Sequence, residues 1–288
     1  MEIDVNGVRC HYQDEGAGPV VILLHGFASQ VYTWRHTIPA LGKDFRVVAV
    51  DLPGYGASGK PAGFEYDLPG FAKWLCAFMD AIGAPRAALI GNSMGGGVAY
   101  TLATSSPERV THLVLVDAVG YQPRRERFFL FRLMAMRGIG ELLMATMTRF
   151  SVRLILRMFV YRDSAHVSEE VVTNYLAPLQ TSGGRDAALR TIRRVSFNAA
   201  PGPDPCRAPT LILWGAKDRI VPPAHASLFL RDIPGAKHHL FDDCGHFPQE
   251  ERAAAFNQRV APFLRQSASG PRALDAEGRY SGVHHEGL

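Results

Sequence analysis

The pentapeptide at residues 91 to 95 reads Gly-Asn-Ser-Met-Gly and places Ser93 in a pattern typical of a nucleophile. An apolar run at residues 87 to 90 precedes it, and a helix-like stretch at residues 96 to 103 follows it. A tight turn between strand and helix forces such a serine to the tip, while the glycines on either side let strand and helix approach each other. The pattern alone is common by chance, so its position after a strand carries the prediction that Ser93 is the nucleophile.

A serine hydroxyl is a poor nucleophile at neutral pH, so Ser93 needs a general base. An imidazole, whose free pKa is about 6.5, can accept its proton. Of the 11 histidines, His246 alone lies in a Gly-His-Phe context after the last predicted strand. A carboxylate on the far nitrogen of the ring would hold one tautomer and offset the positive charge. Asp218 fits this role and completes the chain order Ser, Asp, His.

The oxygen of an acyl carbonyl gains negative charge as the carbon becomes tetrahedral. Two preorganised backbone N–H groups can stabilise this charge by about 3 kcal/mol each. We expect Phe27, in the loop after the apolar run at residues 20 to 24, and Met94, directly after Ser93, to supply them. The side chains of Phe27, Met94 and Phe247 are predicted to line the substrate pocket.

The elements that must position these residues are mostly unbroken runs of Val, Ile, Leu and Ala. Runs of this kind imply strands buried on both faces, as in a parallel sheet. Predicted helices alternate with them, which is typical of a doubly wound α/β fold. The strand-like runs lie near residues 20 to 24, 46 to 50, 87 to 90, 112 to 116, 210 to 214 and 237 to 241. The helix-like stretches lie near residues 34 to 41, 67 to 82, 94 to 105, 223 to 231 and 249 to 265.

The first two strands are predicted to be antiparallel. Asn6-Gly7 separates strand-like residues 2 to 5 from residues 8 to 12, and this dipeptide is the signature of a two-residue type I′ hairpin.

Together these motifs resemble the α/β-hydrolase family from about residue 2 to residue 265. The resemblance includes residues 51 to 58, similar to the turn after the family's fourth strand, and residues 214 to 222, similar to its acid loop. It implies an eight-stranded, mostly parallel sheet with an antiparallel second strand, helices on both faces and a helical cap inserted after strand six. Residues 1–120 and 201–265 would form the core and residues 121–200 the cap, while residues 266–288 are expected to be a disordered tail.

The same resemblance bears on two rival residues. Asp117 follows the sixth strand, where some family members place the catalytic acid, but Asp218 lies in the more usual loop and is preferred. His25 precedes the expected oxyanion donor and is predicted to hold that loop by hydrogen bonds rather than to act as the base.

The predicted cap is rich in Arg, Met, Phe and Leu. Its apolar stretches at residues 128 to 136 and 154 to 160 are expected to pack onto the core. An apolar substrate tunnel and attachment to a membrane surface are two alternatives, of which the membrane contact is the less favoured. Arginines recur too often in both stretches for a transmembrane span.

Composition excludes several other classes. With 288 residues, 47% of them hydrophobic, and a net charge of +4, the chain suits a large globular enzyme and not a nucleic-acid-binding protein. The start of the chain lacks the features of a secretory signal, so the cytoplasm is the simplest location. The oligomeric state is not predicted.

No cofactor and no metal are expected. The stretch at residues 54 to 59 matches Gly-x-Gly-x-x-Gly, but a proline-glycine segment follows where a nucleotide site needs a helix. The 4 cysteines show neither a Cys-x-x-Cys spacing nor a metal-like pairing with histidines.

The predicted reaction is hydrolysis of a small to medium apolar carboxylic ester through an acyl-enzyme on Ser93. The alternative is a hydrolase that cleaves a carbon–carbon bond in vinylogous diketone ring-fission products. That group normally has a more glycine-rich oxyanion loop and a tryptophan after the catalytic histidine, whereas this chain has Phe27-Ala28-Ser29 and Phe247. A non-catalytic ligand-binding member of the fold is a third possibility.

The carbon–carbon alternative requires a cation for the substrate carboxylate. Three arginines of the predicted cap are candidates, although charged residues of this kind more often lie on a solvated helix face. They are Arg190, Arg193 and Arg194.

Overall fold

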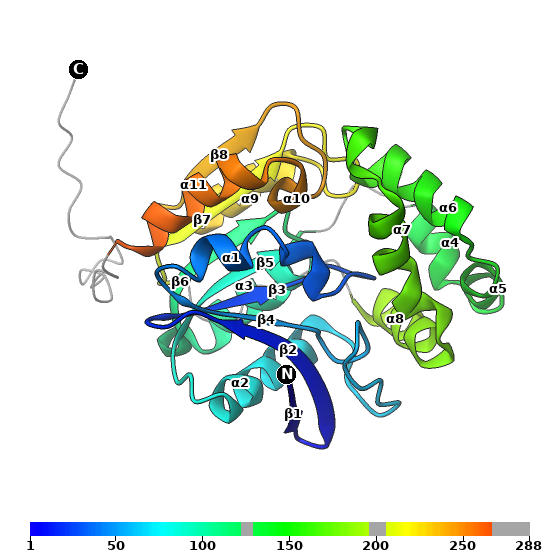
Figure 1. Cartoon of the computed structure of the whole chain (residues 1–288), viewed down its shortest axis with the longest axis horizontal. Helices are drawn as coiled ribbons and strands as arrows, with labels where there is room; N and C mark the ends of the chain where they lie inside the picture. Colours follow the sequence, from blue (N-terminus) through cyan, green and yellow to red (C-terminus); the bar gives the residue numbers. More distant parts are fainter. Residues whose placement is uncertain (122–128, 196–205, 267–288) are drawn as a thin grey trace.

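Strands from both halves of the chain form a single sheet. The structure, a computed structural model, describes residues 1–121, 129–195 and 206–266. Its strand order is β1-β2-β4-β3-β5-β6-β7-β8 (Figure 1). The strands are β1 (Glu2–Val5), β2 (Val8–Glu15), β3 (Val20–Leu24), β4 (Arg46–Val50), β5 (Ala87–Asn92), β6 (Val110–Val116), β7 (Thr210–Gly215) and β8 (Lys237–Phe241).

The second strand runs against its neighbours. β2 pairs antiparallel with both β1 and β4, and every other neighbouring pair is parallel. Asn6 and Gly7 have φ angles of 55° and 78°, as a type I′ turn requires. The predicted eight-stranded, mostly parallel sheet with an antiparallel second strand is confirmed.

Alternate residues of the central strands face two separate cores, which explains their unbroken apolar sequences. In β3, Ile22 and Leu24 belong to one core, and Val21 and Leu23 belong to the other. The first core packs under α2 (Leu68–Ala81), α3 (Met94–Ser105) and α9 (Ala224–Asp232). The second packs under α1 (Ile38–Leu41) and α11 (Ala253–Leu264).

The described chain between β6 and β7 is helical and gathers at one side of the sheet (Figure 1). We call these segments the cap helices. They are α4 (Phe129–Ala135), α5 (Ile139–Ala145), α6 (Arg149–Ile155), η4 (Leu156–Val160), η5 (Ser164–His166), α7 (Glu169–Leu176), η6 (Ala177–Gln180) and α8 (Ser182–Arg194). The remaining short helices are η1 (Val31–Trp34), η2 (Pro107–Arg109) and α10 (Pro248–Glu251).

Parts of the predicted cap and tail lie outside the described residues. They are residues 122–128, 196–200 and 267–288. The proposed boundaries of core, cap and tail therefore stay predictions.

Candidate active site

Ser93 lies at the turn between β5 and α3 and has a backbone conformation that residues other than glycine rarely adopt. Its φ and ψ are 53° and −116°, and its backbone N–H donates to the carbonyl oxygen of Val116 at 2.9 Å. The parallel pairing of β5 and β6 supplies this bond, so the sheet fixes the serine at the carboxyl edge. A positive φ at a serine costs free energy and clusters at functional sites in proteins.

The glycines around Ser93 are required by close backbone contacts. A Cβ at Gly95 would lie 2.3 Å from the carbonyl oxygen of Leu24, and a Cβ at Gly91 would lie 2.3 Å from that of Gly95. The first turn of α3 therefore packs directly on the end of β3, as the pentapeptide predicts.

His246 and Asp218 form a buried pair. The Nδ1 atom of His246 lies 2.7 Å from Oδ2 of Asp218. The other carboxylate oxygen of Asp218 accepts hydrogen bonds from the backbone N–H groups of Ile220 and Val221, at 2.7 and 3.0 Å. A carboxylate oxygen accepts hydrogen bonds, so the Nδ1 atom that faces it carries the proton. Nε2 is then the nitrogen that is free to accept a proton.

Asp117 lies behind this pair, and the described carboxylate bonded to the ring of His246 belongs to Asp218. Its Oδ1 accepts from the backbone N–H of Gly215 at 3.0 Å, while its Oδ2 has no hydrogen-bond partner among the described residues. Burial, followed by the charge of Asp218, raises the pKa of Asp117 well above its usual range.

The three groups bring several possible metal ligands together. Ligand atoms of Asp117, Asp218 and His246 lie within 4.8 Å of one another. However, both oxygens of Asp218 and Nδ1 of His246 are already engaged with each other or with backbone N–H groups. The cluster is therefore a hydrogen-bond network.

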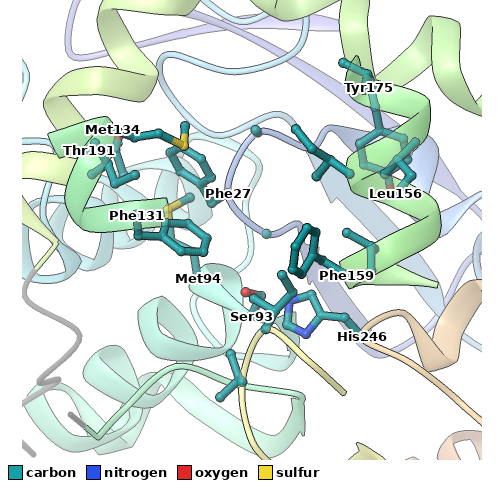
Figure 2. A pocket seen from close by; sticks show the side chains of 18 of the residues that line it. Phe27, Ser93, Met94, Phe131, Met134, Leu156, Phe159, Tyr175, Thr191 and His246 are labelled. Carbon is teal, nitrogen blue, oxygen red and sulfur yellow. The ribbon is translucent and has the colours of Figure 1, made fainter. Parts of the chain in front are cut away.

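Ser93 and His246 line the same pocket and lie close to each other in Figure 2. A further link joins their loops, because the side-chain amide of Asn92 donates to the carbonyl oxygens of Val116 and His246, both at 3.2 Å. Asn92 was not predicted to contribute to the site. The only sequence feature that could have indicated this role is that Asn92 is a polar residue directly before the candidate nucleophile.

The loop after β3 lies against the serine. A Cβ at Gly26 would lie 3.1 Å from the Cβ of Ser93, and Phe27 and Met94 line the pocket. His25 has Nδ1 2.8 Å from the carbonyl oxygen of Gly26 and accepts at Nε2 from the backbone N–H of Leu52 at 3.0 Å. Burial lowers the pKa of His25, so its neutral ring holds the loop in place.

The pocket has a volume of about 210 Å³ and a mostly apolar wall from the core and the cap helices. Phe27, Met94 and Phe247, the predicted pocket residues, all lie in this wall. Cap side chains that line it include Phe131, Met134, Leu156, Phe159, Tyr175 and Thr191 (Figure 2).

The candidate carboxylate-binding arginines do not line this pocket. Arg190 pairs with Asp186 at 2.7 Å, and Arg193 pairs with Glu141 at 2.7 Å, both on exposed surfaces. Arg194 is also exposed. Among the described residues of the wall, Arg219 carries the only permanent positive charge, and it donates to the carbonyl oxygen of Met158 at 2.7 Å.

Two buried glutamates, which the sequence analysis did not predict, bond the cap region to the core beside His246. Glu250 accepts from the hydroxyl groups of Tyr161 and Tyr175 at 2.7 and 2.6 Å, and it pairs with Arg35 at 2.6 Å. Glu251 accepts from the backbone N–H groups of Gly245 and Arg162, both at 2.8 Å. The first glutamate thus joins the cap to the core, and the second joins it to the loop that carries His246.

The described helices include none whose length and apolar character would suit a membrane crossing.

Comparison with known proteins agrees with this fold. The family model described as alpha/beta hydrolase fold matches residues 19–253. The chain therefore belongs to the α/β-hydrolase family, and it is a hydrolase.

Three known proteins show which hydrolases this chain resembles. The chain is 34% identical to a 2-hydroxy-6-oxononadienedioate/2-hydroxy-6-oxononatrienedioate hydrolase from Burkholderia vietnamiensis, over 91% of this chain and 93% of that protein. A meta-cleavage product hydrolase from Pseudomonas fluorescens IP01, solved as a mutant with acetates, superposes with a TM-score of 0.77 at 29% identity, covering 92% of this chain and 97% of the other. A bacterial membrane phospholipase A superposes with a TM-score of 0.78 at 26% identity, covering 92% and 84%.

The names of the first two proteins correspond to the carbon–carbon alternative and do not confirm the expected ester specificity, whereas the third is named as a phospholipase.

Proposed function

We propose that this hydrolase cleaves a carbon–carbon bond beside a ketone, in a vinylogous diketone of the kind that ring fission produces. Its nucleophile is Ser93, its general base is His246, and its orienting acid is Asp218. The observation that carries the proposal is the buried His246–Asp218 pair beside Ser93, in a chain that resembles a named dienedioate hydrolase over nine tenths of its length.

The first half of the reaction forms an acyl-enzyme. His246 Nε2 takes the proton as the hydroxyl oxygen of Ser93 bonds to the ketone carbon. The carbonyl oxygen becomes an oxyanion, which the backbone N–H groups of Phe27 and Met94 stabilise. Asp218 holds the ring and offsets its charge.

The carbon–carbon bond then breaks and its electron pair moves onto the leaving carbon. In a vinylogous diketone this pair is delocalised through the double bond onto the second carbonyl group, and the proton held by His246 completes the leaving product. Water, deprotonated by His246, next attacks the ester on Ser93. The proton returns to the serine oxygen as the acid product leaves.

The mostly apolar pocket wall supports an apolar substituent on the substrate. The cap side chains Phe131, Phe159 and Met134 supply flexible or aromatic surface in this wall. A carboxylate on the substrate would have Arg219 as its only permanently charged partner among the described wall residues.

Ester hydrolysis is the second candidate, and the apolar wall is the observation that favours it. An ester needs no cation in the pocket, and the same three residues would form and hydrolyse the acyl-enzyme. The residues Phe27-Ala28-Ser29 and Phe247 depart from the carbon–carbon group and support this candidate as well.

A substrate panel separates the two candidates. Purified protein is given a vinylogous diketone, with and without a carboxylate, and p-nitrophenyl esters from short to long acyl chains. Ser93→Ala serves as the blank. A higher kcat/KM for a diketone supports the proposal, whereas turnover of esters alone contradicts it and establishes the second candidate.

A further inference from the structure

Large apolar side chains are concentrated on one exposed part of the cap helices. Among the described residues, six of the eight exposed large hydrophobic side chains lie between residues 136 and 159. They are Met136, Leu142, Phe150, Leu154, Met158 and Phe159. Single exposed apolar residues are normal on a protein surface, but a group of them marks an interaction site.

Three of these side chains share one face of a continuous helical segment formed by α6 and η4. Phe150, Leu154 and Met158 recur every four residues and are 72%, 45% and 46% exposed. We call these three the apolar stripe. The opposite side of the segment already has a partner, because Val152 and Leu156 are buried in a core cluster of the cap. The segment is therefore apolar on both sides, and only one side is covered.

The charge around the apolar stripe is positive. Residues 129–195 contain ten arginines, no lysine and five acidic residues. Arg149 and Arg153 interleave with the stripe and pair with Glu169, while Arg157 is exposed beside Met158. Apolar side chains among arginines suit a surface of anionic lipid head groups, into which such helices insert their apolar face.

A second copy of the chain fits this surface less well. A two-fold interface would bring the same patch of each copy together, and hence the arginines of one copy against those of the other. Lipid phosphate groups would instead complement these charges.

The apolar stripe is continuous with the wall of the pocket. Ile155, Leu156 and Phe159 of the same segment line the pocket, and Phe159 is also 38% exposed. Figure 2 shows Phe159 near His246. A molecule dissolved in a lipid layer beneath the stripe would therefore lie close to the candidate active site.

We propose that the apolar stripe of α6 and η4, with its arginines, docks the protein on an anionic lipid surface beside the pocket. From the sequence, the arginines argue only against a spanning segment, and attachment to a membrane surface is the least favoured of three interpretations of these stretches. A helix that lies in the interface has no such restriction, and the exposure of the stripe could be known only from the fold.

Vesicle binding tests the proposal with the full chain. Cosedimentation is measured with vesicles of phosphatidylcholine alone and with vesicles containing phosphatidylglycerol. The test variant is Phe150→Ser/Leu154→Ser/Met158→Ser. The matched control is Leu240→Ser on β8, where an apolar side chain 37% exposed lies outside the cap helices.

We expect the wild type and the control to bind the anionic vesicles, and the triple variant to bind at least tenfold more weakly. Binding should fall on neutral vesicles and at high salt. Circular dichroism checks that the triple variant is folded, and Ser93→Ala should bind as the wild type does, which separates docking from the proposed chemistry.

Two results would overturn the proposal. One is a wild type that does not bind anionic vesicles, or a folded triple variant that binds them equally well. The other is a wild type that light scattering shows to be a dimer and a triple variant that is a monomer, without vesicle binding in either. That second result would assign the stripe to self-association.

Discussion

The backbone N–H of His246 donates a hydrogen bond to the carbonyl oxygen of Val160 at 2.7 Å. Val160 ends η4, so the proposed general base is attached directly to the segment that lines the pocket and carries the apolar stripe. Glu251 strengthens the link by accepting from the backbone N–H groups of Gly245 and Arg162. A shift of the cap helices would therefore also move His246.

The role of Asp218 can be tested against its neighbour Asp117. We predict that Asp218→Asn lowers kcat by about 10⁴-fold, because the ring of His246 would lose its tautomer and its compensating charge. Asp117→Asn should retain activity within about tenfold, since Asp117 lies behind the pair and not on the ring nitrogen. The rate of labelling by a fluorophosphonate measures both variants without knowledge of the substrate. The reverse ranking would make Asp117 the acid.

Asp117 should also make the stability of the protein depend on pH. Burial and the charge of Asp218 raise its folded pKa above the ordinary value of 3.8, so the folded state holds this proton more tightly than the unfolded state. The stability contributed by the protonated group is present at low pH and is lost as pH rises toward the folded pKa.

The variant Asp117→Asn cannot ionise and keeps the acceptor that bonds Gly215. As the pH rises from about 4, the melting temperature of the wild type should therefore fall relative to that of the variant. Melting curves across this range provide the measurement. Parallel pH profiles for the two proteins would show that Asp117 is not held neutral.

Glu250 should be critical for attachment of the cap. Glu250→Gln removes the charge that pairs with Arg35 and weakens the bonds from Tyr161 and Tyr175. We expect a loss of roughly 3 kcal/mol in the free energy of unfolding, because a buried partner is removed from a charged network. Denaturant titration tests this, with the exposed Glu108→Gln as control. A loss no larger than that of the control would mean that the network contributes little.

The close packing around Ser93 predicts that one added methyl group will strongly lower the stability of the protein. In Gly95→Ala the added Cβ would meet the carbonyl oxygen of Leu24 at 2.3 Å, so we expect a loss of about 3 kcal/mol or more. Gly63 has nothing within 4 Å of an added Cβ, and Gly63→Ala should stay within about 0.5 kcal/mol of the wild type. Equal stabilities would show that α3 can move away from β3.

The fold could be predicted because the apolar runs in the sequence mark the same strands that the buried parallel sheet needs. Each central strand is buried on both faces, so its sequence is mostly an unbroken apolar run. Ser93 and Asp218 follow two such strands, whereas His246 follows the largely exposed edge strand β8. Carboxyl ends of parallel strands meet at one edge of the sheet, which brings Ser93, Asp218 and His246 together although they are distant in sequence.

Side-chain partners in the cap could not be predicted in the same way. Glu250 bonds Arg35 and Tyr161, which lie 215 and 89 residues away, and no local pattern encodes such contacts. The exposure of Phe150 and Leu154 could not be predicted from the sequence for a related reason. An apolar helix face has the same sequence whether a core covers it or not, and only the packing of the other helices decides which faces remain open.

The central proposal for this protein is that Ser93 is an activated nucleophile with His246 as its base. Intact-mass spectrometry after treatment with a fluorophosphonate, with peptide mapping, measures this without any assumption about the substrate. We predict a single adduct on Ser93 in the wild type and none in folded Ser93→Ala. A folded wild type that stays unlabelled, or an adduct that persists in Ser93→Ala, would contradict the assignment of Ser93 as the activated nucleophile.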